Sequence, residues 1–273
     1  MLKKMIGILF VTFVVTQSSA FAGFWAGAVP PEIISTNGHE IDNLFMYTTW
    51  LNIVYFILVC AGLFGFSYLY WYKRSPKAYY TYGNKKEHLV VTMIIGAAVF
   101  LSIDLNITRM SNDDMINEFW KFPDASKEEV IQIEVLAQQW MWNFRYAGVD
   151  GKFNTADDVL SNHDLRIPVG KKVEFRISSK DVIHSLYFPN ARLKADAIPG
   201  RITRLWFQPT KTGEFDIACA EMCGTHHYLM KAKLRVETEE DYKLWLGEAE
   251  RLALAGNDVD NLDNYWGWKW EEQ

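Results

Sequence analysis

Two stretches near the start of the sequence are apolar and uncharged over lengths that suit membrane-spanning helices. Residues 43–72 contain no charged side chain, and this stretch ends in three aromatic residues followed by two cations, as at the cytoplasmic end of a span. Residues 89–103 form a shorter stretch. Because a span needs ~20 residues, we extend this helix to about Ile107 and place Asp104 at the outer interface. The pattern predicts a hairpin of two transmembrane helices within residues 43–109.

The loop between the two helices predicts the orientation of the hairpin. It contains five cations before its first acidic residue, Glu87, and an excess of Lys and Arg is typical of cytoplasmic loops. These cations are Lys73, Arg74, Lys77, Lys85 and Lys86. We therefore expect a multi-pass protein of a bacterial cytoplasmic membrane, with everything after the hairpin on the outer, periplasmic side.

The first residues of the chain predict a signal peptide. Two lysines precede an apolar stretch over residues 5–15, and an A-x-A sequence ends at Ala22. We expect cleavage after Ala22, which removes residues 1–22 and leaves residues 23–42 as an external N-terminal segment. An uncleaved first membrane helix is the alternative, although so short an apolar stretch is marginal for crossing ~30 Å of hydrocarbon.

Apolar and polar residues alternate in short runs between residues 131 and 236. Examples are the runs over residues 173–177, 203–207 and 232–236, and Pro and Gly residues interrupt the pattern between such runs. Alternation with a period of two places one face of a strand in a core and the other in water. We therefore predict an all-β antiparallel sandwich or barrel, which forms a domain over residues 110–237.

The end of the chain, residues 238–273, is predicted to leave the sheets. Apolar residues recur at helical spacing between Glu239 and Leu254, which predicts a short amphipathic helix. The final segment is rich in aromatic residues around Trp268. We expect this tail to dock on a neighbouring protein or on the membrane surface, with a disordered end as the alternative.

Residues 150–158 collect carboxylates and turn-forming residues in one loop. Oxygen ligands of this kind could bind a calcium ion. A solvated hairpin loop is the simpler interpretation, because the EF-hand pattern with its closing Glu is absent from the loop. Both interpretations stay open from the sequence.

Charge and cysteine content narrow the class of partner and of chemistry. The 273-residue chain has a net charge of −5, whereas binding to nucleic acid calls for a basic face. We therefore expect no nucleic-acid partner, and an acidic external domain suits a basic protein partner better. Three cysteines are too few for a disulfide framework, but Cys219 and Cys223 lie close together.

One segment of twelve residues concentrates soft metal ligands. It contains the thiols of Cys219 and Cys223, the imidazole of His227 and the thioether of Met230. His184 lies 35 residues before Cys219, and a β-sandwich can bring such a strand end beside a later loop. Thiolate, imidazole and a weak thioether ligand favour copper and electron transfer. Two thiolates on one loop can bridge two copper ions.

Two other interpretations use the same residues. A disulfide between Cys219 and Cys223 suits an oxidising compartment, and a zinc site would use these cysteines with two histidines. Met230 favours copper, since zinc gains nothing from a thioether. His226 is interpreted as a surface neighbour of the site.

At these residues the sequence resembles subunit II of the haem-copper oxidases, whose copper loop has the form C-x-E-x-C-G-x-x-H-x-x-M. Here the loop consists of Cys219, Glu221, Cys223, Gly224, His227 and Met230. The resemblance runs over about residues 43–236 and includes the segments 139–142, 182–185 and 196–201. It implies a two-helix transmembrane hairpin plus an all-β cupredoxin-like Greek-key sandwich domain.

The resemblance further implies a binuclear copper centre, CuA, whose ligands are His184, Cys219, Glu221, Cys223, His227 and Met230. In the family the two cysteines bridge the copper ions and each histidine ligates one of them. The Met side chain and the backbone carbonyl of the Glu complete the coordination.

Other positions matched by the resemblance concern the partners. In the family the side chain of Glu221 binds a magnesium or manganese ion at the contact with the catalytic subunit. Trp140 matches the tryptophan through which the electron from cytochrome c enters, although from its residue type alone it could be a core aromatic. Asp196 and Arg201 are placed against the catalytic subunit by the resemblance, and an ordinary turn would explain them equally well.

One departure from the family concerns proton uptake. Many relatives carry a Glu four residues before a Trp-Thr pair in the second helix, at the mouth of a proton pathway. Here Val91-Thr92 replaces the pair, His88 occupies the Glu position, and Glu87 lies next to it. We hypothesise that Glu87 or His88 takes over proton entry, and an interfacial charge pair that sets the helix end is the alternative.

The expected function is electron relay from cytochrome c through a CuA centre to the haem-copper catalytic subunit I, which assembles with other oxidase subunits in membrane lipid. The donor is a separate protein or domain, because no C-x-x-C-H haem-attachment motif is present. A CuA subunit of a nitric oxide reductase is the alternative. A copper-delivery protein would need ligands open to exchange, and the quinol-oxidase counterpart lacks the metal cysteines.

Overall fold

The computed structural model describes residues 30–71, 80 and 82–256. The predicted signal peptide, most of the cations in the connecting loop and the aromatic tail lie outside the described residues. The chain divides into two units, residues 1–33 and residues 34–273, and all the described helices and strands belong to the second.

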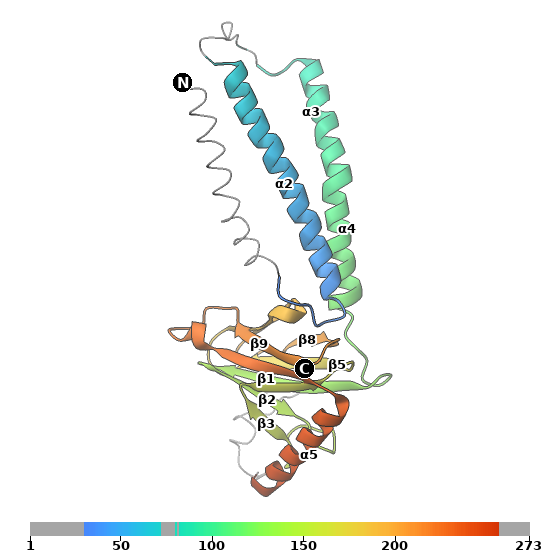
Figure 1. Ribbon diagram of the computed structural model, residues 1–273, viewed down its shortest axis with the longest axis vertical. Helices are drawn as coiled ribbons and strands as arrows, with labels where there is room; N and C mark the ends of the chain where they lie inside the picture. The colour runs from blue at the N-terminus through green and yellow to red at the C-terminus, as the bar shows by residue number, and fades with distance from the viewer. Residues whose placement is uncertain (1–29, 72–79, 81, 257–273) are drawn as a thin grey trace, which may run out of the picture. The chain divides into compact units, whose positions relative to one another are not determined.

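Two helices among the described residues are long and apolar enough to cross a membrane. The first is α2 (Gly38–Leu69). The second runs without a break through α3 (Lys86–Val99), the π-helical η1 (Phe100–Asp104), α4 (Leu105–Asp114) and the π-helical η2 (Met115–Phe119). Within the most apolar 18-residue window of each helix no residue is buried in the protein, as expected for a surface that faces lipid. Figure 1 shows α2 near α4 and diverging from α3, and Asn106 Nδ2 in α4 donates to Tyr47 Oη in α2 at 3.3 Å.

The second helix extends beyond its predicted end near Ile107 to Phe119. The uncharged run stops at Asp104, but neither Gly nor Pro occurs between Gly96 and Pro123 to interrupt the helix. Charged residues limit the length of helix that can lie in lipid, whereas the helix itself ends only where Gly or Pro interrupts it. The predicted bounds at 43 and 109 therefore fall inside helices, and the first strand begins only at Val130.

Among the described residues, ten strands form two five-stranded sheets. The first sheet, in the order β3-β2-β1-β5-β8, contains β1 (Val130–Gln138), β2 (Met141–Tyr146), β3 (Val159–Asn162), β5 (Lys172–Ser179) and β8 (Thr203–Phe207). The second, in the order β4-β10-β9-β6-β7, contains β4 (Asp164–Pro168), β6 (His184–Phe188), β7 (Leu193–Ala197), β9 (Gly213–Cys219) and β10 (Lys231–Glu237).

The sandwich is mixed rather than wholly antiparallel. The pairs β1–β5 and β4–β10 are parallel, and the other paired strands are antiparallel. The alternating pattern predicts which face of a strand is buried but carries no information on strand direction, because both kinds of strand have a period of two. The prediction of an antiparallel sandwich was wrong in this respect.

Aromatic side chains from both sheets form the centre of the core. Phe175 of β5 packs against Phe188 of β6 and Phe207 of β8, with ring centroids 5.3 and 5.7 Å apart. All three are at most 1% exposed, and full burial of one such side chain stabilises a fold by about 1.5–3 kcal/mol. The apolar residues 173, 175 and 177 of the alternating run therefore lie on the core face of β5.

The helix α5 (Glu239–Gly256) occupies the position expected from the helical spacing. Its start is fixed by Thr238, whose hydroxyl accepts a hydrogen bond from the Asp241 backbone N–H at 3.2 Å and donates to the Asp241 carboxylate at 2.7 Å. The helix packs on the sandwich through Trp245, whose ring centroid lies 5.1 Å from that of Tyr146.

In the acidic loop, residues 150–158, the carboxylates accept hydrogen bonds from backbone and side-chain groups of the same loop. Asp150 accepts a hydrogen bond from the Lys152 N–H at 2.8 Å, and Asp158 accepts one from the Asn154 N–H at 2.8 Å. Asp157 accepts from the hydroxyl of Thr155 at 2.7 Å, which lowers the pKa of the Asp157 carboxyl. These bonds hold the loop in shape.

A buried arginine links the acidic loop to the first sheet. Arg145 of β2 has no exposed surface and donates to the carboxylate of Glu134 in β1 and, at 3.1 Å, to the side-chain oxygen of Asn154. Its Nε also lies 3.7 Å from Asp158 Oδ2. Burial raises the pKa of Asp158 to about 6, although Arg145 acts in the opposite direction.

Candidate metal centre

The fold brings the predicted ligands together from two neighbouring strands. His184 is the first residue of β6, Cys219 is the last residue of β9, and these strands pair with Leu186 opposite Cys219. The metal loop, residues 219–230, then leads through the 3-10 turn η4 (His227–Leu229) into β10. The pairing of β6 with β9 therefore brings His184 close to Cys219, although 35 residues separate them in the sequence.

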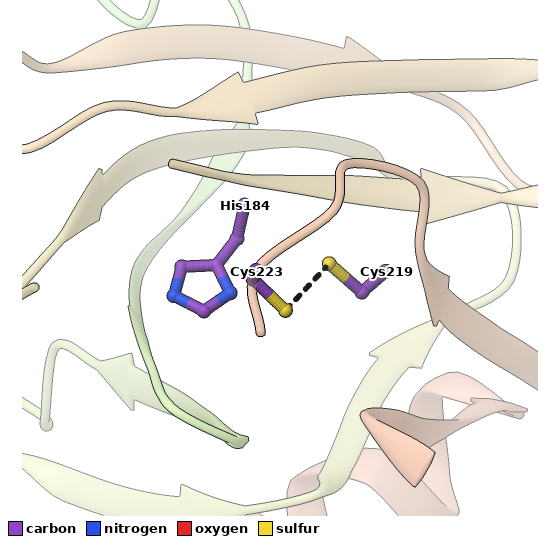
Figure 2. Close-up of side chains that lie close together, drawn as sticks. All are labelled: His184, Cys219 and Cys223. Carbon is purple, nitrogen blue, oxygen red and sulfur yellow. Dashed lines mark hydrogen bonds between the residues drawn. The ribbon is translucent and has the colours of Figure 1, made fainter. Parts of the chain in front are cut away.

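Three ligand-type side chains, those of His184, Cys219 and Cys223, lie within 4.8 Å of one another at their donor atoms (Figure 2). The two sulfurs are unlinked and 3.8 Å apart, at the position of the dashed line in Figure 2. His227 Nδ1 is 3.6 Å from Cys223 Sγ. All four residues of the predicted thiol and imidazole set therefore share one site.

The remaining two predicted donors lie in the same cluster. The thioether sulfur of Met230 is 3.1 Å from His184 Nδ1 and 3.8 Å from Cys223 Sγ. The backbone carbonyl of Glu221 is 3.2 Å from Cys219 Sγ. Met230 and His184 are fully buried and Cys223 is nearly so, whereas Cys219 is half-buried.

The electrostatics of the cluster favour ionisation of one thiol. Burial opposes the charged form, but hydrogen bonds from His184 and from the Ser185 backbone lower the pKa of Cys219 to about 6. Burial and the neighbouring Cys219 raise the pKa of Cys223 to about 12. A bound cation would stabilise both thiolates, because metal ligation replaces the thiol protons.

The donor set fits copper better than zinc. Two thiols, two imidazoles, a thioether and a carbonyl converge on one small site, and soft sulfur donors with imidazole are typical copper ligands. A tetrahedral zinc site would use only the cysteines and histidines. The buried Met230 sulfur, aimed into the cluster, is the observation that a zinc site leaves unexplained.

Comparison with known proteins identifies the family. The profile described as "Cytochrome C oxidase subunit II, periplasmic domain" matches residues 131–236. The alternative cytochrome c oxidase subunit 2 of Bradyrhizobium diazoefficiens is 33% identical over 251 residues, covering 83% of this chain and 86% of that protein. The chain belongs to the cytochrome c oxidase subunit II family.

Two further relatives are consistent in name. The probable cytochrome c oxidase subunit 2 of Rickettsia conorii is 27% identical, covering 91% of this chain and 81% of the relative. The crystal structure of the periplasmic domain of subunit II of cytochrome oxidase of Bradyrhizobium japonicum is 26% identical, with a TM-score of 0.40, and covers 45% of this chain and 94% of that one. By the profile match, the β domain of this subunit II chain is the cupredoxin-like domain of the family, and two helices long and apolar enough to span a membrane precede it.

Trp140 lies beside the metal loop of this subunit II chain, in the turn between β1 and β2. Its indole ring packs against the imidazole of His226, with centroids 4.4 Å apart. Trp142, two residues later, is fully buried and has its ring centroid 6.1 Å from that of His184. Of the two tryptophans, the core aromatic is therefore Trp142, and His226 is a packing partner of Trp140 that the sequence did not reveal.

Asp181 was also missed by the sequence analysis. Its Oδ1 lies 2.9 Å from His184 Nε2, so that the other ring nitrogen, Nδ1, faces the sulfur donors. A carboxylate that holds the outer nitrogen of a metal-binding histidine fixes its tautomer and orientation. The signal in the sequence was an acidic residue three positions before the histidine, and spacing alone could not show that it turns back.

Four predicted residues have side chains outside the sulfur cluster. The Glu221 carboxylate is exposed, although its backbone carbonyl belongs to the site. Glu87 and His88 are exposed in the first turn of α3, in the helical hairpin. Asp196 accepts a hydrogen bond from the Ser185 hydroxyl at 2.7 Å, next to the ligand His184.

Proposed function

We propose that this chain is the electron-entry subunit of a terminal respiratory oxidase, which passes electrons from cytochrome c through a binuclear CuA centre to the haem-copper catalytic subunit. The observation that carries the proposal is the convergence of six donors from His184 and the metal loop on one site. The relatives are all named as cytochrome c oxidase subunits, and none of those compared favours the nitric oxide reductase alternative.

In this proposal each donor of the cluster has one task. Cys219 and Cys223 would hold both copper ions, since their sulfurs lie 3.8 Å apart in the cluster. His184, Met230, His227 and the Glu221 carbonyl would supply the remaining ligands. A bound copper pair supplies a centre that takes up and releases one electron. The tightly packed surroundings of His184 and Met230 hold the ligands in place, which keeps the rearrangement during electron transfer small.

Electron entry is assigned to Trp140, because the residue is partly exposed and its ring contacts His226 of the metal loop. The Glu221 carboxylate is exposed beside the copper ligands, where it is free to bind a magnesium or manganese ion at the contact with the catalytic subunit.

Glu87 or His88 is proposed for proton entry, since both are ionisable and exposed at the start of a membrane helix. The protein is proposed to lie in the bacterial inner membrane, with the β domain on the periplasmic side.

Electron spin resonance of the purified full-length chain loaded with copper tests the proposal. One unpaired electron shared equally by two copper nuclei gives a seven-line hyperfine pattern, and two copper ions per chain should be bound. A single copper, a single zinc or a Cys219–Cys223 disulfide would refute it. Identifying the second metal at the active site of the co-purified catalytic subunit separates an oxidase, with copper, from a nitric oxide reductase, with non-haem iron.

A further inference from the structure

Gln139, in the turn between β1 and β2, is hydrogen-bonded to both segments that carry the metal ligands. Its side-chain Nε2 donates to the backbone carbonyl of Cys223 at 2.8 Å. Its backbone N–H donates to Asp181 Oδ2 at 2.6 Å, and the other oxygen of Asp181 is the one that binds His184. A single residue thus bridges the metal loop and the segment that leads to His184, and the next residue in the chain is Trp140.

The packing around this turn leaves little room for other arrangements. A Cβ atom at Gly224 would lie 2.9 Å from Gln139 Nε2 and 3.3 Å from Trp140 Cζ2. Gly224 also has φ of +118°, a conformation that other residues rarely adopt. The absence of a side chain at Gly224 therefore lets the metal loop approach both side chains, and His226 covers the Trp140 ring at 4.4 Å between centroids.

The position of Gln139 argues against a role in core stability. The residue is exposed and outside the hydrophobic core, and a neutral hydrogen bond at the surface contributes little to the folding free energy. A glutamine at an exposed turn is ordinarily solvated. Here both its backbone and its side chain are used to hold the turn against the metal-binding segments, which fixes the adjacent indole.

We propose that Gln139 is a positioning residue for electron entry: it holds the Trp140 ring against the backbone of the metal loop at the contact that the incoming electron crosses. The inference rests on the proposed function. The step moves one electron from the ferrous haem of the donor, which becomes ferric, to the copper pair, which is reduced by one electron. No bond is made or broken, and no proton moves.

The test uses the assembled oxidase, with reduced cytochrome c mixed rapidly with the oxidised enzyme. Gln139→Ala removes the side-chain amide, and Gln139→Asn keeps an amide that is one methylene too short to reach Cys223. Gln208→Ala is the matched control, because the Gln208 amide makes the same kind of bond, to the Gly170 carbonyl at 2.7 Å, at the end of β8. The readouts are the limiting rate of electron entry, the donor concentration at half saturation and the copper spin resonance spectrum.

We expect both Gln139 variants to lower the limiting rate about tenfold, as is typical when an outer hydrogen bond of a metal site is lost. The half-saturating donor concentration and the copper spectrum should match those of the unmodified enzyme, and the control should match it in all three readouts. A higher half-saturating concentration at an unchanged limiting rate would show that Gln139 only contacts the donor, and loss of the copper signal would show a role in the ligand set; either outcome overturns the inference. An unmodified enzyme without the seven-line signal overturns the proposed function itself, whereas a normal signal with unchanged entry rates in the variants overturns only the role of Gln139.

Discussion

The metal loop and the acidic loop are both rich in residues that bind metals, but they use them in opposite ways. In the metal loop the donor atoms of Cys219, Cys223 and Met230 face one another and a histidine from a neighbouring strand. In the acidic loop the carboxylates accept hydrogen bonds from backbone and hydroxyl groups of the same loop. Ligand-type residues in a short segment are therefore not sufficient for a site, because the donor atoms must also be left pointing at a common centre.

The two loops are also supported differently by the sheets beneath them. The metal loop is flanked by buried soft donors, and its outer contacts run through Gln139 and Asp181. The acidic loop is held to the sheet by the buried Arg145, whose positive charge pairs with Glu134 of the sheet and Asp158 of the loop. We expect substitutions in the first to change metal chemistry and substitutions in the second to change folding.

The largest effect is expected from the bridging thiols. Cys223→Ser replaces a soft thiolate by a hydroxyl of similar size, so the chain should keep its fold and lose the seven-line copper signal completely. Spin resonance with copper analysis of the purified chain measures the loss of the signal, and circular dichroism measures the fold. Cys60→Ser is the control, because Cys60 lies in α2, and it should leave the signal unchanged. Retention of a two-copper spectrum in Cys223→Ser would contradict the assignment of this loop.

Arg145→Met should lower the stability of the fold and leave the metal loop unchanged, the opposite of the result expected for Cys223→Ser. It removes the Arg145 charge from the buried carboxylates of Glu134 and Asp158 and leaves Glu134 with Arg176, 3.8 Å away; breaking a buried ion pair in this way typically costs about 3–5 kcal/mol of stability. Denaturant unfolding of the full-length chain measures this loss, while the folded fraction should keep a normal copper spectrum. Arg251→Met, at the exposed pair with Glu248, should leave the unfolding midpoint essentially unchanged.

The pH dependence of the same variant gives a second check on the buried carboxylates. The pKa of Asp158 is about 6 in the folded chain, above the ordinary value of 3.8, so the folded state binds the proton more tightly. The contribution of this group to stability is then fully present below pH 3.8 and falls as pH rises through about 6. Without Arg145 the loss should continue to higher pH, and a destabilisation of Arg145→Met that shrinks between pH 5 and pH 8 would contradict the ion-pair account.

The sequence indicated that the soft side chains of the metal loop gather at one place, because their chemistry and spacing are both local. It also predicted the strands of the β domain and the start of α5, where periodicity and the Thr238 cap act within a few residues. It did not predict the parallel pairings or the role of Asp181, because both depend on which segments meet in space. The end of the second helix was missed for another reason, since the helix was extended past Asp104 only as far as a membrane span requires, to about Ile107.

The smallest effect is expected in the acidic loop. Asp157→Ala removes the acceptor for the Thr155 hydroxyl and for the Asp150 N–H, and such hydrogen bonds contribute about 0.5–1.5 kcal/mol each. The thermal midpoint should fall by a few degrees without any change in copper binding. Adding calcium to the unmodified chain should not raise that midpoint, because the loop carboxylates already have partners within the loop. A calcium-dependent rise in the thermal midpoint that Asp157→Ala abolishes would instead show that the loop carboxylates exchange their internal hydrogen bonds for a bound ion. The two loops would then differ in the kind of metal they bind, soft for the thiols and hard for the carboxylates, and not in the orientation of their donor atoms.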